Sequence, residues 1–196
     1  CGIVATKRTD GESYLCKNAS AKIARFVRLC DSFSIPVVTL ADVDGFAPSS
    51  MDEIAGSIRE AAKLAHVYAE STTAKISVIV GNAIGSAYIA LCGSGSGSDA
   101  VFAWPGAVVS ALKPDAAVAF LWNDKLQGSA DPIADRAKLV EEYTLTVGSA
   151  FEAAKKGCID SVIDPADTRK TILNALDMLS TKRVSRLPKK HSNMPL

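Results

Sequence analysis

The stretch VIVGNAIGSAYIAL, Val78–Leu91, decides how this chain is interpreted. Its first three residues are apolar and β-branched, as expected of a strand that is buried on both faces of a sheet. Gly81 and Gly85 allow close backbone approach, and the run from Ser86 onward has helical composition. The stretch therefore predicts a buried strand that ends in a tight turn and continues directly as a helix.

A strand-to-helix turn of this kind leaves the N–H groups of the helix's first turn without intrahelical acceptors. These groups lie at the positive end of the helix dipole, so they can stabilise a developing oxyanion without a charged side chain. A plain turn in an α/β domain would have the same local pattern. On this stretch alone, both interpretations are open.

Composition bounds the class of protein. The chain has 196 residues, enough for one well-cored domain, and 48% of them are hydrophobic. The net charge of +1 argues against nucleic acid as a partner, because phosphate binding needs a concentrated basic face. The basic run Lys182–Lys190 is interpreted as a solvated tail, with a strap against a partner subunit or an acidic coenzyme as the alternative. We expect a single domain, 1–196, with its basic tail at about 182–196.

The five cysteines are far apart and form no C-x-x-C pair. They argue against a disulfide scaffold and a zinc site and predict a reducing compartment, the cytoplasm. The sequence has no signal peptide and no apolar run near the length of a membrane span. Because it opens on Cys1 rather than Met, inside an expected strand, we expect a domain taken from a longer protein.

Strands and helices are expected to alternate along the chain. The expected strands are 2–7, 37–42, 75–80, 101–104 and 161–163. The expected helices are 18–33, 50–71, 86–91, 114–122, 133–147, 150–156 and 166–180. Alternation means a mainly parallel sheet with right-handed crossovers, and physical reasoning alone leaves a doubly wound fold and a ββα spiral open.

Three details of this assignment concern helix ends and faces. Asn18 or Ser20 is expected to cap the first helix, and Gly45 is expected to turn the chain after the second strand. Ser49 or Ser50, with Glu53, suggests a capping box at the start of the second helix. One apolar line is expected along that helix: Ile54, Ile58, Ala61 and Leu64.

The sequence lacks the residue patterns of the common catalytic sites. His66 and His191 have no metal-ligand spacing to a second ligand, and we predict no metal. No G-x-S-x-G elbow occurs, and the run 81–86 lacks the lysine and the spacing of a P-loop. Glu141 and Glu142 are adjacent and would point to different sides of a helix, which argues against the carboxylate pair of a hydratase.

An ordered set of motifs carries a resemblance that covers essentially the whole chain. The set includes ARFVRLCD at 24–31, IPVVTLADVDGF at 35–46, IGSAY at 84–88, FAWP at 102–105, GCID at 157–160 and KKHSNMPL at 189–196. The chain resembles the C-terminal half of the carboxyltransferase subunit of biotin-dependent acyl-CoA carboxylases and decarboxylases. This resemblance implies an α/β fold of the crotonase type, a ββα spiral with a mostly parallel sheet and flanking helices.

The resemblance also implies a reaction and its partners. A carboxyl group would pass between biotin, held by a biotin carboxyl carrier protein, and a short-chain acyl-CoA, in either direction. In that family the biotin removes the α proton, so the protein supplies oxyanion donors and a closed cleft rather than a base. The N-terminal carboxyltransferase half would complete the site across a subunit interface, in a homo- or hetero-oligomer. The chain alone would then be an incomplete enzyme.

The family's site residues map onto the turn and one neighbouring loop. The resemblance makes the backbone N–H groups of Ser86 and Ala87 the donors to the biotin oxyanion. The residues expected to line the substrate site are Gly85, Tyr88, Ile89, Gly45 and Phe46.

Two departures from the family pattern leave alternatives open. The family has Gly where this chain has Ser86, and Pro where it has Asp44. The first change keeps an amide, provided that the dihedral angles accept a Cβ. A non-catalytic assembly module of a carboxyltransferase complex is the second interpretation, and a coenzyme A hydratase or hydrolase is the third. We also expect self-association, or association with the missing half, through helices 50–71 and 133–147.

Overall fold

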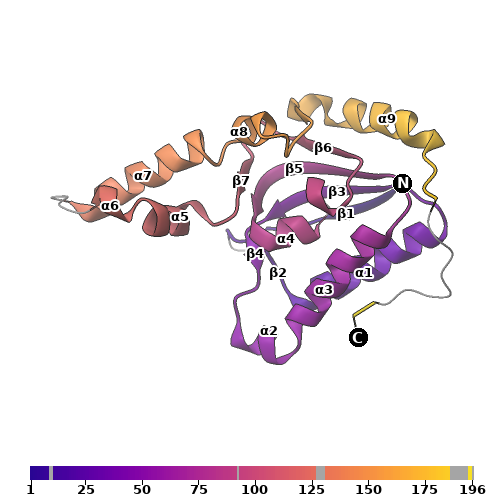
Figure 1. Cartoon of the computed structure of the whole chain (residues 1–196), viewed down its shortest axis with the longest axis horizontal. Coiled ribbons are helices and arrows are strands. Elements are labelled where there is room, and N and C mark those ends of the chain that lie inside the picture. The colour runs from indigo at the N-terminus through magenta and orange to yellow at the C-terminus, as the bar shows by residue number, and fades with distance from the viewer. Residues whose placement is uncertain (9–10, 92, 127–130, 186–193, 196) are drawn as a thin grey trace.

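A central parallel sheet is covered by helices on both faces (Figure 1). The computed structural model describes residues 1–8, 11–91, 93–126, 131–185 and 194–195. The strands run in the order β1-β3-β5-β6-β8, and β7 pairs with the end of β5. Their bounds are β1 (Gly2–Ala5), β3 (Val37–Val43), β5 (Lys75–Ile84), β6 (Ala100–Ala103), β7 (Val108–Ser110) and β8 (Ser161–Val162). Every pair of these strands is parallel, as the alternating pattern predicts.

Helices α1 and α3 lie against one face of the sheet and α9 lies against the other (Figure 1). The helices of the body are α1 (Lys17–Ser32), α2 (Ser50–Ile54), α3 (Ser57–Glu70), α4 (Gly85–Ala90), α8 (Ala150–Lys155) and α9 (Thr168–Met178). Short 3-10 turns cover Ser94–Ser96, Pro165–Asp167 and Leu179–Thr181. A second, two-stranded parallel sheet joins β2 (Tyr14–Leu15) to β4 (Gly45–Phe46).

The central strand β5 explains why the core is two-sided. Its Ile79 packs into the cluster that faces α1 and α3, together with Leu64. Its Ile76 and Val78 pack into the cluster that faces α9. A parallel strand covered on both faces has no polar side, so its sequence is a nearly continuous apolar run rather than an alternating one.

The helix expected over 50–71 is in fact two helices. Gly56, with a φ of +89°, occupies the left-handed region and separates α2 from α3. The expected apolar line is therefore wrong, because Ile54 is 84% exposed and Ile58 is 74% exposed, whereas Leu64 is buried. Ser49 caps α2 by accepting from the N–H of Asp52, so Glu53 is not its partner.

Two further expectations about helix and turn positions are corrected. No side chain caps α1, which begins at Lys17, so neither Asn18 nor Ser20 is its cap. Gly45 does not simply turn the chain, because it pairs with Tyr14 in the small sheet. Strands of two residues have no periodicity to find in a sequence, so this sheet was missed.

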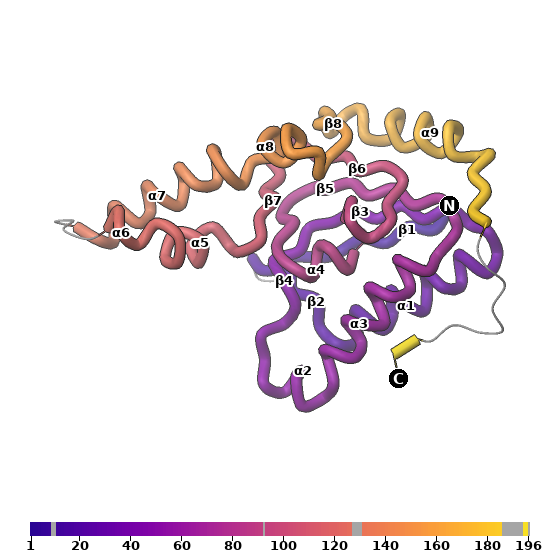
Figure 2. The backbone as a smooth tube through the Cα atoms, viewed as in Figure 1, coloured from indigo at the N-terminus to yellow at the C-terminus, as the bar shows by residue number. Residues whose placement is uncertain are grey.

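Three helices form an arm that extends away from the sheet (Figure 2). They are α5 (Pro114–Leu121), α6 (Asn123–Leu126) and α7 (Pro132–Thr146). The arm has a small core of its own, in which the rings of Trp122 and Tyr143 meet edge to face at 5.4 Å. The sequence predicts α5 and α7 but not α6.

The start of the basic tail is anchored rather than solvated. Lys182 donates to the carboxylate of Asp99 at 2.8 Å and to the carbonyl of Thr73 at 3.1 Å. The loop at 127–130 and most of the tail motif lie outside the described residues. Among the helices that the structure describes, none has the length and apolar character needed to cross a bilayer.

Candidate functional site

The strand-to-helix turn is sharper than its sequence suggests. Strand β5 does not end at Val80 but runs on to Ile84, and α4 begins at the next residue. Its early part pairs with β6 as far as Ile79, and its last three residues, 82–84, pair with β7 instead. No loop separates the two elements, so the direction of residues 82–84 sets the position of the first turn of α4.

Gly85 makes this junction possible. Its φ is +63°, in the left-handed region, and a Cβ placed on it would lie 3.2 Å from the carbonyl oxygen of Ala111. Ser86 follows with an exposed side chain, whereas Ala87 is fully buried. In the first turn of a helix the N–H groups have no acceptor four residues earlier, so the chemistry available here is that of backbone donors.

The other expected site residues lie around this turn, either on the neighbouring strand β4 or further along α4. Strand β4, which is Gly45 and Phe46, contacts α4, and both of its residues are half-buried. Ile89 is 57% exposed, so it is available to a ligand. Tyr88 is buried in the core cluster under the turn. The structure therefore brings the residues of two distant motifs, 42–46 and 84–89, to one place.

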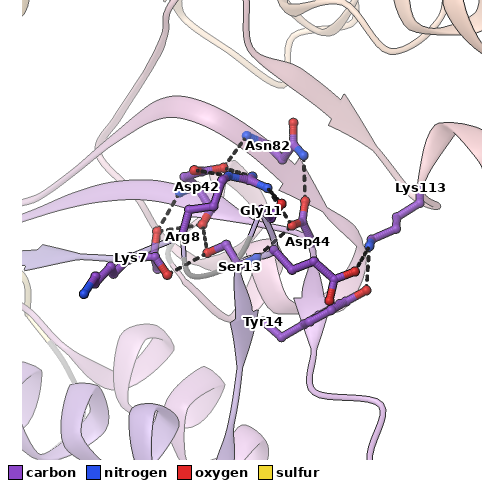
Figure 3. Close-up of polar contacts among 11 residues, drawn as sticks. Lys7, Arg8, Gly11, Ser13, Tyr14, Asp42, Asp44, Asn82 and Lys113 are labelled. Carbon is purple, nitrogen blue, oxygen red and sulfur yellow. Dashed lines mark hydrogen bonds and ion pairs between the residues drawn. The ribbon is translucent and has the colours of Figure 1, made fainter.

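A cluster of charged residues lies beside this place, at the carboxyl ends of β1, β3 and β5 (Figure 3). Arg8 donates to Asp42 through Nε at 3.0 Å and Nη2 at 2.5 Å, and to Asp44 through Nη1 at 3.0 Å. Asn82 donates its backbone N–H to Asp42 at 2.8 Å and its side-chain amide to Asp44 at 2.6 Å. One guanidinium, together with the backbone N–H and the side-chain amide of one asparagine, thus holds two carboxylates at the ends of three strands.

The environment of Asp44 keeps its carboxylate ionised. Burial raises the pKa of Asp44, but hydrogen bonds from Asn82, from the N–H of Ser13 and from Arg8 together outweigh burial and leave this pKa below its ordinary value. The hydrogen bond to Asp42 in turn raises the pKa of Arg8. The cluster is a network in which Asp44 is buried, Asp42 is half-buried and Arg8 covers them from the exposed side, and each of these charges has partners.

A residue larger than glycine would not fit at position 81, because the side chain of Asp42 lies against it. A Cβ on Gly81 would fall 2.5 Å from Oδ1 of Asp42. Close backbone approach at Gly81 is therefore confirmed, and the neighbour that requires it is a carboxylate.

Lys113 extends this charged region toward the arm. Its Nζ donates to the hydroxyl of Tyr14 at 2.5 Å and lies 3.6 Å from a carboxylate oxygen of Glu12. The hydrogen bond to Tyr14 raises the pKa of Lys113. The ammonium group therefore stays charged two residues beyond Ala111, whose carbonyl faces Gly85.

Sequence reasoning missed the charged cluster, although one signal was present. Two aspartates, Asp42 and Asp44, stand at the carboxyl end of a buried strand, and the carboxyl ends of parallel strands meet at one edge of a sheet. Nothing local marks Arg8 as their partner, because 34 residues separate it from Asp42. Within the described part of the chain, no group of three or more His, Cys, Asp or Glu side chains is arranged to hold a metal ion.

Comparison with known proteins places this geometry in context. A family model of the carboxyl transferase domain matches residues 1–194. The methylmalonyl-CoA carboxyltransferase 12S subunit of Propionibacterium freudenreichii subsp. shermanii is 43% identical over 99% of the chain and 37% of its own length. The propionyl-CoA carboxylase carboxyltransferase subunit of Haloferax mediterranei is 42% identical over 100% of the chain and 38% of its own length. The methylmalonyl-CoA decarboxylase subunit alpha of Veillonella parvula is 40% identical over 100% of the chain and 37% of its own length.

Solved structures agree with the fold. A transcarboxylase 12S hexamer structure has a TM-score of 0.91 at 43% identity and covers 99% of this chain and 37% of that chain. The geranyl-CoA carboxylase beta subunit of P. aeruginosa has a TM-score of 0.75 at 21% identity, which supports the fold alone. These neighbours confirm the crotonase-like fold that the sequence resemblance implies. The chain spans 37–38% of the length of these curated relatives.

Proposed function

The chain belongs to the carboxyl transferase domain family, and from this premise we propose that it is the biotin-facing half of an acyl-CoA carboxyltransferase. Residues 1–196 would form one domain, the C-terminal half of the subunit. The reaction would move a carboxyl group between biotin on a carrier protein and a short-chain acyl-CoA. Because relatives include a methylmalonyl-CoA carboxyltransferase and a propionyl-CoA carboxylase, we propose an acyl group of that size.

The observation that carries the proposal is the first turn of α4. It lies at the end of a rigid buried strand, with Ser86 exposed and with β4 in contact with α4. Phe46 and Ile89 offer partly exposed apolar surface next to backbone donors. A bicyclic, mostly apolar ring with one ureido oxygen has matching chemistry, so the residues present fit biotin.

The role of the chain's own atoms follows from this arrangement. Biotin, when bound, supplies the carboxyl group that is transferred. The N–H groups of Ser86 and Ala87 would donate to the ureido oxygen, where negative charge develops, and one such donor contributes about 3 kcal/mol to transition-state stabilisation. Gly85, Gly45 and Phe46 would shape the entrance, while Tyr88 supports the turn from below. No side-chain base is required of this half.

The missing partner would complete the coenzyme A site. We propose that the N-terminal carboxyltransferase half, on the same or another subunit, faces α4 across an interface. Exposed apolar side chains support association: Phe120, Leu121, Ile133 and Leu145 on the arm, and Ile54 and Ile58 on α2 and α3. Sedimentation at high micromolar concentration should detect a self-associated species, or a complex once the companion half is added. A strictly monomeric chain that ignores the companion half would contradict this.

A binding and turnover experiment tests the function. The chain, combined with an N-terminal half, should bind free biotin with millimolar or tighter affinity. The complex should also transfer a carboxyl group between a biotinylated carrier and propionyl-CoA or methylmalonyl-CoA. Because the same site serves both directions, transfer is measured in each. Absence of biotin binding across the millimolar range would overturn the proposal.

The exposed arm favours one alternative, a non-catalytic assembly module. In that case the chain would associate through the arm but would bind neither biotin nor the carrier. The hydratase alternative gains nothing from the structure, because Glu141 and Glu142 lie exposed on α7, in the arm. Detectable hydration of crotonyl-CoA would revive it.

A further inference from the structure

We propose that Asp44 is a positioning residue, which fixes the two walls of the candidate site relative to each other. The inference rests on the proposed function. Gly45 and Phe46 follow Asp44 directly in β4, and Asn82, which binds Asp44, precedes Gly85 by three residues. All of the proposed site residues therefore lie within seven positions of Asp44 or of Asn82.

The carboxylate of Asp44 is held from three directions. Oδ1 accepts from the side-chain amide of Asn82 at 2.6 Å. Oδ2 accepts from the N–H of Ser13 at 2.8 Å and from Nη1 of Arg8 at 3.0 Å. The Asp44 side chain is 4% exposed, so water does not compete strongly for these bonds. Three donors from two segments, the connection between β1 and β2 and the strand β5, leave this carboxylate little freedom to move.

Arg8 links Asp44 to a second anchor. The same guanidinium binds Asp42, whose Oδ1 also accepts from the backbone N–H of Asn82. Asn82 is thus fixed at its main chain by Asp42 and at its side chain by Asp44 (Figure 3). Nη1 of Arg8, which donates to Asp44, also donates to the carbonyl of Gly11 at 2.7 Å and so ties the adjoining loop to this set.

A displacement of Asn82 would reach α4 because nothing flexible lies between them. Residues 82–84 are paired with β7, and α4 starts at Gly85 with no intervening loop. Gly85 itself is confined by the carbonyl of Ala111. The geometry of the Ser86 and Ala87 donors thus depends on where Asn82 is held, and small errors in such geometry weaken catalysis and binding strongly.

Asp44 is the shared acceptor of three donors: the side-chain amide of Asn82, the N–H of Ser13 and Nη1 of Arg8. A residue without a side-chain acceptor at position 44 would leave all three donors without this partner.

The competing interpretation is that the network only stabilises the fold, and a matched control separates the two. Asp31 is also a carboxylate that anchors backbone, because it accepts from the N–H groups of Thr72 and Thr73 at 2.7 and 3.0 Å. Asp31 belongs to the last turn of α1, and the N–H groups that it binds lie just before the start of β5, at the opposite end from α4. Asp31→Asn should therefore cost stability without moving the turn.

The variants are Asp44→Asn, Asn82→Ala and Asp31→Asn, each in the full chain with its companion half. Asn82→Ala removes only the hydrogen bond between the Asn82 side chain and Asp44. It therefore tests the same link if Asp44→Asn fails to fold. Two readouts are taken at matched fractions of folded protein: the amide chemical shifts and exchange rates of Ser86 and Ala87 without ligand, and the affinity for free biotin. Both Asp44→Asn and Asn82→Ala should speed amide exchange at the turn, and weaken biotin binding, by about tenfold or more.

Asp31→Asn should leave both readouts at the turn unchanged while lowering the melting temperature. Equal effects of Asp31→Asn and Asp44→Asn would overturn the positioning role, and so would unaltered Ser86 and Ala87 amides in Asn82→Ala. Failure of the unsubstituted complex to bind biotin would contradict the proposed function instead. In that event the ligand-free amide comparison still decides whether Asp44 positions the turn.

Discussion

Lys182 Nζ lies 2.8 Å from Oδ2 of Asp99, and both side chains are more than four-fifths buried. The same carboxylate oxygen accepts from the N–H of Lys75, the first residue of β5. The segment that follows α9 is thus fixed to the edge of the sheet where the central strand begins. The basic run is interpreted from the sequence as a solvated tail, or alternatively as a strap against a partner subunit or coenzyme, but its first lysine binds within its own chain.

Replacing Lys182 should therefore destabilise the fold. Lys182→Ala leaves the largely buried carboxylate of Asp99 without its cation and should lower the free energy of unfolding by about 1–3 kcal/mol. Urea denaturation measures this. Lys138→Ala is the matched control, because Lys138 pairs with Asp135 on the exposed face of α7 and should change stability by less than about 0.5 kcal/mol. Equal effects of the two variants would show that Lys182 is an ordinary surface lysine.

Gly81→Ala tests the close approach of Asp42. The added methyl would lie 2.5 Å from a carboxylate oxygen that Arg8 and Asn82 hold in place, so the neighbour cannot move freely. We expect a loss of about 1–3 kcal/mol in the free energy of unfolding, as for other overpacked sites.

Gly106→Ala is its control, because a Cβ there meets nothing within 4 Å. Its free energy of unfolding should stay near that of the unsubstituted chain. A Gly81→Ala protein that is as stable as Gly106→Ala would mean that the Asp42 carboxylate is not held where the structure places it.

Acid should weaken the fold partly through Asp44. The pKa of this carboxyl is lowered in the folded state, so its contribution to stability is present above the unfolded-state pKa. That contribution is lost as the pH falls through the folded-state pKa, which lies below the ordinary value for an aspartate. The free energies of unfolding of the unsubstituted chain and of Asp44→Asn should differ at pH 7 and converge as the pH is lowered. Parallel curves from pH 7 downward would show that Asp44 contributes no proton-linked stability.

The sequence predicts what is local or periodic and misses what is neither. The strands β3 and β5 and the junction at Gly85 are marked by apolar runs and a glycine, so they are found. Asp44, Arg8 and Ser13 meet only because β1 and β3 are neighbours in the sheet, and no pattern records a contact across 36 residues. The break at Gly56 was missed because the apolar spacing continues across it.

Substitutions at Ser86 separate a backbone mechanism from a side-chain mechanism. If Ser86 donates its N–H, its hydroxyl is dispensable, so Ser86→Gly in the complete enzyme should keep the turnover rate within about tenfold, or roughly 1.4 kcal/mol. Ser86→Pro removes the donor while keeping a residue that the first turn of a helix tolerates, and should cost about 10²–10³ in rate. Ala87 cannot be tested with a large side chain, because its methyl group is fully buried and overpacking would disturb the core.

The exposure of Ser86 makes this comparison clean, because neither replacement has to enter the core. Circular dichroism and melting temperature should match among the three proteins, so that a lost rate reports the donor and not the fold. Turnover is then measured in the direction that the complete enzyme supports. Loss of turnover in Ser86→Gly as complete as in Ser86→Pro would place the chemistry on the hydroxyl and rule out the amide-donor mechanism. We expect the opposite, since none of the hydrogen bonds and ion pairs in the described part of the chain joins the Ser86 hydroxyl to a histidine or carboxylate that would activate it.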